Sequence, residues 1–393
     1  MIAYNRQDLD NREIQEQVAE ASTKRLITAE EHTRIREAYP CKLYTPNVYI
    51  RIGIFLLTIL ASACCLGLLA LMGLWGSDRS AGVLLIVFGM IAYGALEWFI
   101  RVRGVYRSGQ DDALMWVAAA SVLAGIDINA EPVSASAESL VIFVLATLNV
   151  LRYTDRLMAL VAYGALLGFF FFTLAGEGPV ARSLLPFVVM AVSVVFYFLF
   201  TRLSAASGLR HYHSCFTLLR VATLLSFYLA GNYYVVREMN ASLSGESGSV
   251  TPGESGSVAL GFLWWALTVC TPVFYIVRSI QKKDVIFLWT GLALVAATVF
   301  TIRYYYHVLP AELAMIIGGS LLIAVAYYLI RHLRTPKHGF TSAAAEEPHL
   351  LEKLPVEALI QAESFQTTGT RPAGPDTRFG GGSGGGGGAG GQY

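Results

Sequence analysis

The chain has 393 residues, of which 55% are hydrophobic and only 15% are charged. Soluble domains carry about 25% charged residues, so the composition excludes an ordinary water-soluble globule, and the apolar content excludes disorder for most of the chain. The 29 basic and 28 acidic residues leave a net charge of +1, which offers no electrostatic footprint for nucleic acid. This is the composition of a multi-pass membrane protein whose bilayer is its first partner.

The first 47 residues are polar and predict a cytoplasmic helical leader ahead of the membrane domain. Within residues 1–47, residues 7–39 predict two short helices. The second begins with a capping box, because the Thr28 hydroxyl and the Glu31 carboxylate are spaced to bind each other's backbone amides. Pro40 ends this helix. No apolar stretch follows a basic start, so we expect no cleaved signal peptide.

Residues 48–334 form the predicted transmembrane domain, where apolar runs are compared with the roughly 20 residues that a spanning helix needs. Two runs, 112–127 and 138–151, are short, and we expect either a re-entrant hairpin or two helices sheltered by their neighbours. The fold class is therefore all-α, a polytopic transmembrane helix bundle of about ten helices, or of eight if the short pair does not span. The predicted segments are 48–74, 81–101, 112–127, 138–151, 156–175, 183–201, 214–236, 257–277, 285–303 and 309–331.

Lys and Arg are unevenly distributed over the loops that alternate between the two sides of the membrane. Cytoplasmic loops are enriched in these residues, so the richer set is expected in the cytoplasm. The basic residues before the first segment and after the last agree, and both termini are predicted to be cytoplasmic. The richer set holds Arg101, Arg103, Arg107, Arg152, Arg156, Arg202, Arg210, Arg278, Lys282 and Lys283, whereas the poorer set holds Arg79, Arg182, Arg237 and Arg303.

Two segments have the composition of flexible chain. The longest outer loop, 238–256, is polar and contains a direct repeat of Gly-Glu-Ser-Gly-Ser-Val. Residues 335–393 predict a cytoplasmic tail that is disordered at its glycine-rich end, because such a sequence buries no core. We expect residues 366–393 to be dispensable for folding.

The sequence contains no recognisable catalytic motif. It has no Walker A sequence and no His-Glu-x-x-His, and it has no Gly-x-Ser-x-Gly outside the low-complexity glycine-rich end. The glycine-rich end is no phosphate loop, because no strand precedes it and no helix follows it. The five cysteines show no paired spacing and are interpreted as packing residues. We therefore predict no catalytic residue, no cofactor and no metal centre.

Charged side chains inside apolar runs are costly in a membrane and mark candidate ligand-binding positions. Glu97 lies about one turn from the cytoplasmic end of its segment, where Arg101 predicts an i,i+4 ion pair. Arg220 is the deepest charge. It either snorkels to the headgroups or faces an anionic substrate or lipid headgroup. We also hypothesise a pair between Arg220 and Glu97, which lie at similar depth on the same side.

Two histidines complete the set of candidate ligand-binding residues. His211 and His213, followed by Cys215, lie where a cytoplasmic loop meets the seventh segment. Two His and one Cys are ligands for zinc or copper, but no fourth ligand lies nearby. Interfacial packing is therefore preferred to metal binding.

A weak internal similarity links two cytoplasmic loops. Arg107-Ser108-Gly109-Gln110, followed by Asp112, resembles Arg278-Ser279-Ile280-Gln281, followed by Asp284. A parallel repeat, as in some transporters, is one explanation. Common loop chemistry or chance is the other.

The N-terminal region resembles a family of bacterial predicted multi-pass inner-membrane proteins of unknown function. The resemblance rests on Lys24-Arg25-Leu26-Ile27-Thr28-Ala29-Glu30-Glu31 and on the entry sequence Tyr49-Ile50-Arg51-Ile52-Gly53. It covers about the first 130 residues through loose motifs. It implies a cytoplasmic helical leader, eight to ten transmembrane helices and a bacterial inner-membrane location, and it transfers no functional residue.

Three functions remain compatible with the sequence. The first is a non-enzymatic scaffold, sensor or assembly partner that binds proteins through its cytoplasmic ends. The absence of catalytic motifs and the absence of charges at the membrane midplane both favour it. The second is a small-molecule or lipid transporter, favoured by the helix number and the internal similarity. The third is an intramembrane transferase that uses Glu97, Arg220 or the His211/His213 loop.

Overall fold

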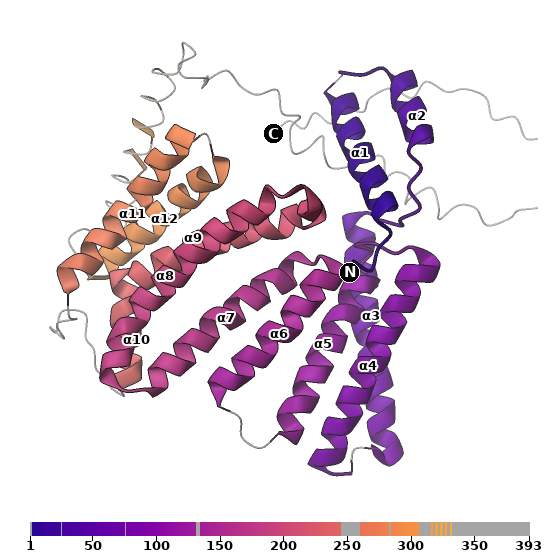
Figure 1. Cartoon of the computed structure of the whole chain (residues 1–393), viewed down its shortest axis with the longest axis horizontal. Helices are drawn as coiled ribbons and strands as arrows, with labels where there is room; N and C mark the ends of the chain where they lie inside the picture. Colours follow the sequence, from indigo (N-terminus) through magenta and orange to yellow (C-terminus); the bar gives the residue numbers. More distant parts are fainter. Residues whose placement is uncertain are drawn as a thin grey trace, which may run out of the picture. The chain divides into compact units, whose positions relative to one another are not determined.

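The computed structural model describes residues 2–24, 26–74, 76–130, 134–244, 260–282 and 284–305, with isolated residues between 316 and 331. In this part of the chain all regular elements are helical, which confirms the all-α prediction (Figure 1). The helices are α1 Arg6–Thr23, α2 Ala29–Ala38, α3 Val48–Leu69, α4 Asp78–Arg103, α5 Gln110–Asn129, α6 Ala135–Tyr153, α7 Arg156–Gly176, α8 Pro179–Ser204, α9 His213–Gly231, α10 Tyr233–Ser244, α11 Gly261–Lys282 and α12 Val285–Tyr305. A π-helical turn, Ala70–Leu74, and a 3₁₀ segment, Ser207–Tyr212, accompany them.

The chain divides into two compact units, 1–315 and 316–393. Helices α1 to α12 all belong to the first unit. The predicted tail, 335–393, lies outside the described residues, as does most of the predicted segment 309–331.

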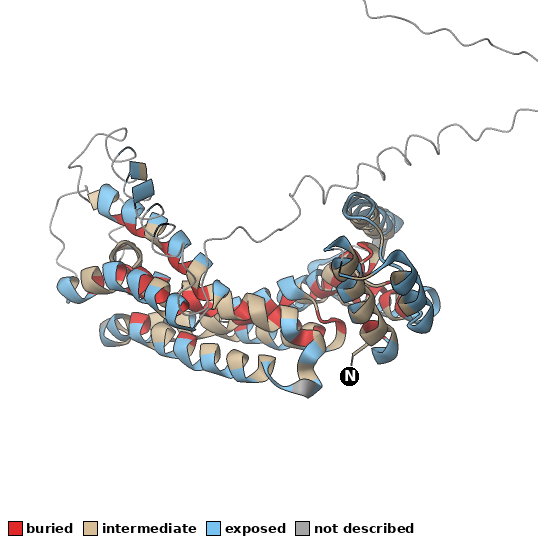
Figure 2. Ribbon diagram, turned by 90° about the horizontal axis from the view of Figure 1, so that it is seen from above, coloured by how far each residue is buried: buried red, intermediate tan, exposed pale blue. Residues whose placement is uncertain are grey.

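Eight helices of the described part are long and apolar enough to cross a membrane, as a multi-pass membrane protein requires. They are α3, α4, α6, α7, α8, α9, α11 and α12. Helix α3 has no buried residue, and Leu56, Leu57 and Leu60 are exposed along it. Such side chains suit contact with lipid. Figure 2 shows that buried residues lie along the sides where helices face one another.

The two segments predicted to be short are longer helices than expected, although only α6 is among the eight candidate spans. Helix α5 has 20 residues and α6 has 19, which correspond to about 30 Å and 28 Å at 1.5 Å per residue. The prediction of short helices is wrong because it counted only apolar residues. Polar residues complete the terminal turns, as Asp111 and Asn129 do in α5 and Ser136 and Arg152 do in α6.

The seventh predicted segment, 214–236, is two helices rather than one. Helix α9 ends at Gly231, and the Asn232 side chain accepts hydrogen bonds from the amides of Tyr234 and Val235, at 2.9 and 3.4 Å. This cap starts α10 in a new direction. The first part of the predicted flexible loop, 238–244, is therefore helical, whereas 245–256 lie outside the described residues.

The proline in α11 is compensated by a neighbouring helix. Pro272 has no amide hydrogen, which leaves the carbonyl of Thr268 without its helical donor. Thr298 of α12 lies 3.0 Å from that carbonyl oxygen, in donor position. Its hydroxyl also contacts that of Tyr228 at 2.9 Å, and Tyr228 accepts from Asn232 at 2.9 Å. These buried groups join α9, α11 and α12.

Four pairs of consecutive helices, α4 with α5, α6 with α7, α8 with α9 and α11 with α12, pack extensively as hairpins. A Cβ atom built on Gly125 would lie 2.5 Å from the carbonyl oxygen of Gly82 and 2.6 Å from the side chain of Ile86. One built on Gly89 would lie 2.7 Å from Val122. The absence of side chains at these positions therefore lets the backbones of α4 and α5 approach.

Candidate functional site

The predicted leader is docked on the helix connections, and its central contact is the buried carboxylate of Asp111. This side chain accepts from the amides of Arg107 and Ser108 at 2.7 and 2.8 Å, and from the Ser108 hydroxyl at 3.0 Å. Positive φ angles at Arg107 and Gly109 aim the backbone amides at the carboxylate. The Tyr4 hydroxyl donates to it from the leader at 3.3 Å. Burial, and secondarily the charge of Asp111, raises the pKa of Tyr4 well above its ordinary value.

Further contacts attach the leader to the same end of the helices. The backbone of Tyr44 forms a two-bond bridge with the connection between α4 and α5. Its amide donates to the carbonyl of Gly104 at 2.9 Å, and its carbonyl accepts from the amide of Tyr106 at 3.2 Å. The rings of Tyr4 and Tyr106 pack edge to face with centroids 4.8 Å apart. The Ala3 amide donates to the carbonyl of Arg152 at 2.9 Å, at the end of α6.

The predicted His211/His213 site is part of this docking surface. Asp10 of α1 forms an ion pair with Arg210 and lies 3.4 Å from Nε2 of His211. His213 is exposed at the start of α9, whereas Cys215 is buried and contacts the carbonyl oxygen of Thr154 at 3.3 Å. In the described part of the chain, no group of three or more His, Cys, Asp and Glu side chains is arranged to hold a metal ion.

Glu97 is the centre of an ionic cluster that joins α4 to α6. Its two carboxylate oxygens each accept from Arg152 at 2.7 Å, a bidentate arrangement, and Tyr153 donates to it at 3.1 Å. The predicted pair with Arg101 is confirmed, at 3.5 Å. The main partner, Arg152, was missed because it comes from another helix. Its carbonyl also binds the leader through Ala3, so this cluster adjoins the docking contacts.

Arg220 has an acidic partner, but that partner is not Glu97. It forms an ion pair with Asp284 at 2.5 Å, and the two side chains are only 15% and 23% exposed. Its guanidinium lies 5.8 Å from the centre of the Tyr197 ring. The hypothesis of an Arg220–Glu97 pair is therefore wrong. The physical reason is that α9 packs on α7, α8, α11 and α12, whereas α4 packs chiefly on α5.

The acidic residues of the two similar loops have equivalent partners. Asp112 binds Arg51 of α3 at 2.6 Å, and Asp284 binds Arg220 of α9. Each acid lies at the start of the helix that follows its loop, and each arginine comes from an earlier helix. The similarity was therefore a usable signal for the partner of Arg220.

We expect Arg220 and Asp284 to be energetically coupled. Arg220→Leu leaves a buried carboxylate unpaired, and Asp284→Asn leaves a buried guanidinium without its charged partner, so each single variant should destabilise the protein. The double variant should destabilise it by less than the sum of the two single effects. Asparagine keeps the side-chain oxygen that accepts from the Ile286 amide at 3.0 Å, so the α12 cap is retained. Thermal unfolding in detergent measures both effects.

The matched cycle combines Arg220→Leu with Glu97→Gln, whose side chains belong to separate clusters. Its effects should add within about 0.5 kcal/mol. Additivity in the Asp284 cycle, or coupling in the Glu97 cycle, would contradict the assignment of partners.

A groove of about 550 Å³ lies beside Arg220, between α8, α9, α11 and α12. Tyr197, which contacts Arg220, forms part of its wall. Most of the lining is apolar, and two basic side chains, Arg278 and Lys282, stand at one end. The other lining residues are Ser193, Val194, Phe198, Thr223, Leu224, Phe227, Leu267, Cys270, Thr271, Phe274, Tyr275 and Phe287.

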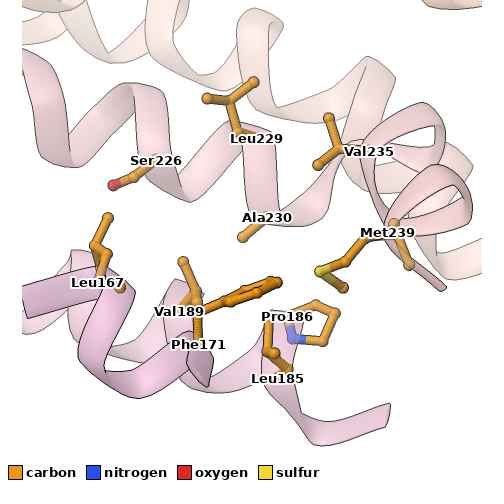
Figure 3. A pocket seen from close by; sticks show the side chains of 12 residues that line it. Leu167, Phe171, Leu185, Pro186, Val189, Ser226, Leu229, Ala230, Val235 and Met239 are labelled. Carbon is orange, nitrogen blue, oxygen red and sulfur yellow. The ribbon is translucent and has the colours of Figure 1, made fainter. Parts of the chain in front are cut away.

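A second pocket of about 410 Å³ lies on the other side of the α8–α9 hairpin, towards α7 and α10 (Figure 3). Side chains such as Phe171, Pro186 and Met239 surround it, and Ser226 supplies the one hydroxyl among its described lining residues. Ser226 hydrogen-bonds Ser193 of the larger groove at 2.8 Å and Tyr163 of α7 at 2.6 Å. This hydroxyl cluster therefore lies between the two spaces.

The four predicted site residues lie in three separate places. His211 and His213 flank the start of α9, with His211 against the leader, Glu97 lies between α4 and α6, and Arg220 lies beside the larger groove. No family model matches the chain, and no curated protein or solved structure matches it significantly.

Proposed function

We propose that this multi-pass membrane protein is a non-enzymatic scaffold or assembly partner whose docked leader binds another protein in the cytoplasm. The observation that carries the proposal is the attachment of one leader to three connections. Asp111 holds it at the α4–α5 connection, Arg152 at the end of α6, and Arg210 before α9. A leader fixed at three points presents a surface of constant shape, which lowers the entropic cost of binding a partner.

The outward surface of the leader is available for such a partner. Helix α2 has no buried residue, and its first turn carries Glu30 and Glu31. Leu26, between α1 and α2, is 73% exposed. A largely polar surface that also exposes Leu26 and Tyr39 suits a soluble protein partner better than the bilayer.

Photo-crosslinking in intact cells tests the proposal. A photoreactive amino acid at Leu26 should give a discrete protein adduct, which Asp111→Ala should reduce at least fivefold and Glu177→Gln should not affect. A probe at Leu57, on exposed α3, should give lipid adducts only. Absence of a protein adduct from Leu26 and from probes along α2, or an adduct indifferent to Asp111→Ala, would overturn the proposal.

Orientation is part of the proposal, and fusions test it. The leader contacts loops of the set that is richer in Lys and Arg, which supports a cytoplasmic leader. Alkaline phosphatase fused within 245–259 should be active, whereas the same enzyme fused after residue 340 should be inactive. Green fluorescent protein should show the opposite pattern. Activity on the same side at both positions would refute two cytoplasmic termini and with them the predicted inner-membrane topology.

A small-molecule or lipid transporter is the second candidate, favoured by two spaces that are lined by the hydrogen-bonded hydroxyls of Ser193 and Ser226. In a cysteine-free background, cysteines at Ser193 and Ser226 would be labelled by small water-soluble reagents from opposite sides if these spaces form a transport route. Lack of labelling at both positions would argue against transport.

A further inference from the structure

We propose that the groove between α8, α9, α11 and α12 binds an anionic phospholipid, with the acyl chain along the groove and the phosphate at Arg278 and Lys282. This inference is independent of the scaffold proposal. It rests on the length of the groove, the chemistry of its walls and the charge at its end.

The groove has the length of one lipid leaflet. Along α11 its lining extends from Leu267 to Lys282, and the part between Leu267 and the first basic residue, Arg278, is about 16 Å long at the helical rise of 1.5 Å per residue. Half of a hydrocarbon core of about 30 Å is about 15 Å. Leu267 therefore lies near the middle of the bilayer when Arg278 lies at the headgroups. An acyl chain from the leaflet on the Lys282 side matches this span.

The walls offer mainly apolar surface, and three of the hydroxyl groups that line them are already bonded within the protein. Tyr275 donates to the carbonyl of Leu224 at 3.2 Å, Thr223 to that of Arg220 at 2.8 Å, and Ser193 to that of Val189 at 2.7 Å. A guest therefore needs no hydrogen-bonding groups along this length. A hydrocarbon chain satisfies that condition, whereas a sugar or a nucleotide does not.

The groove is open along one side to the surroundings of the helices. Phe198 of α8 and Phe274 of α11 line it, and each is 60% exposed. Cys270, about one turn before Phe274 on α11, is exposed as well. A lipid enters such a groove sideways from its own leaflet, without crossing a polar barrier.

The charge at the end of the groove selects an anion. Arg278 and Lys282 line it, and no acidic residue is among the described lining residues. The hydrogen-bonding partner of Arg278 is the neutral amide oxygen of Gln281 at 3.3 Å. Asp284, the acid of the same connection, is bound to Arg220. Two basic side chains at headgroup level attract anionic lipids, which a zwitterionic headgroup does not match.

Native mass spectrometry of the full-length protein tests the proposal, with phosphatidylglycerol and phosphatidylcholine of identical chains offered in detergent. Phosphatidylglycerol should remain bound at least fivefold more than phosphatidylcholine. The double variant Arg278→Gln/Lys282→Gln should abolish this preference. The matched control, Arg101→Gln/Arg103→Gln, removes the same charge at the end of α4 and should leave it unchanged.

A second pair of variants tests the acyl-chain site. Cys270→Trp places a ring in the open groove and should reduce retention of both lipids, whereas Val299→Trp, exposed on α12 and outside the groove, should not. Size-exclusion profiles show whether each variant is folded. If Cys270→Trp does not fold, the test rests on the lipid preference of the charge variants.

Two results would overturn the proposal. Equal retention of both lipids, unaffected by Arg278→Gln/Lys282→Gln, would show unspecific lipid contact only. Protein dimers that exclude lipid and are lost in Cys270→Trp would show that a second copy of the chain occupies the groove.

Discussion

Replacing Asp111 by alanine is expected to release the leader while the helices remain assembled. The substitution leaves the amides of Arg107 and Ser108 and the hydroxyl of Tyr4 without their acceptor. Each buried donor left unsatisfied costs about 1–3 kcal/mol, and a tenfold change in an equilibrium corresponds to about 1.4 kcal/mol. Tryptic cleavage at Lys24 and Arg34 should therefore accelerate at least tenfold.

The membrane domain, which we expect to resist trypsin, is the internal standard of this experiment. Cleavage of the leader is measured relative to the amount of intact membrane-domain fragment in each variant. Asp111→Asn keeps one carbonyl acceptor and should lie between wild type and alanine. Glu177 is exposed at the end of α7, so Glu177→Gln removes a charge and should leave the rate of tryptic cleavage unchanged. Unchanged cleavage in Asp111→Ala would mean that Asp10 and Tyr44 hold the leader without this carboxylate.

Replacing Gly125 by alanine is expected to destabilise the α4–α5 hairpin. The new methyl group would lie 2.5 Å from the carbonyl oxygen of Gly82 and 2.9 Å from the amide of Ile86. Both are backbone atoms of a helix and move only if the whole helix moves. Overpacking of this kind costs about 1–3 kcal/mol, which should appear as a lower midpoint of thermal unfolding in detergent.

Gly94 provides the matched control in the same hairpin. A Cβ atom there has no other atom within 4 Å, so Gly94→Ala should be neutral or should stabilise α4 by up to about 1 kcal/mol through helix propensity. Equal effects of the two substitutions would show that glycine loss itself, and not the close approach of α4 and α5, determines stability.

Local signals in the sequence predicted local structure well. The capping box at Thr28 is present, with the Glu31 amide donating to the Thr28 hydroxyl at 3.2 Å and the carboxylate accepting from the Thr28 amide at 2.9 Å. This backbone hydrogen bond, with that of the hydroxyl, lowers the pKa of Glu31. Apolar runs likewise located the spanning helices, because a bilayer requires long apolar segments.

The break at Asn232 was missed because Tyr233 and Tyr234 continue the apolar run beyond it. Hydropathy records which residues tolerate lipid, but it does not record where the backbone changes direction. Asparagine between two apolar stretches was the available signal, since its side chain caps helices. The same applies to Ser108 and Asp111, whose three-residue spacing across the start of α5 resembles a capping box.

The partners of Glu97 and Arg220 were not predictable from helical periodicity. Arg101 is one turn from Glu97 and follows from helix geometry, but Arg152 comes from α6 and Asp284 from the connection before α12. Such pairs depend on which hairpins are neighbours, and many arrangements of apolar helices bury similar area. Only the similarity between the loops of Asp112 and Asp284 carried information of that kind.

The proline of α11 has a consequence for how this part of the protein moves. Straightening or twisting the helix at Pro272 displaces the carbonyl of Thr268, and the hydroxyls of Thr298 and Tyr228 have to follow it. Tyr228 is in turn bound to Asn232, which sets the direction of α10. We therefore expect slow amide hydrogen exchange around this relay, with conformational freedom concentrated at the opposite, basic end of α11.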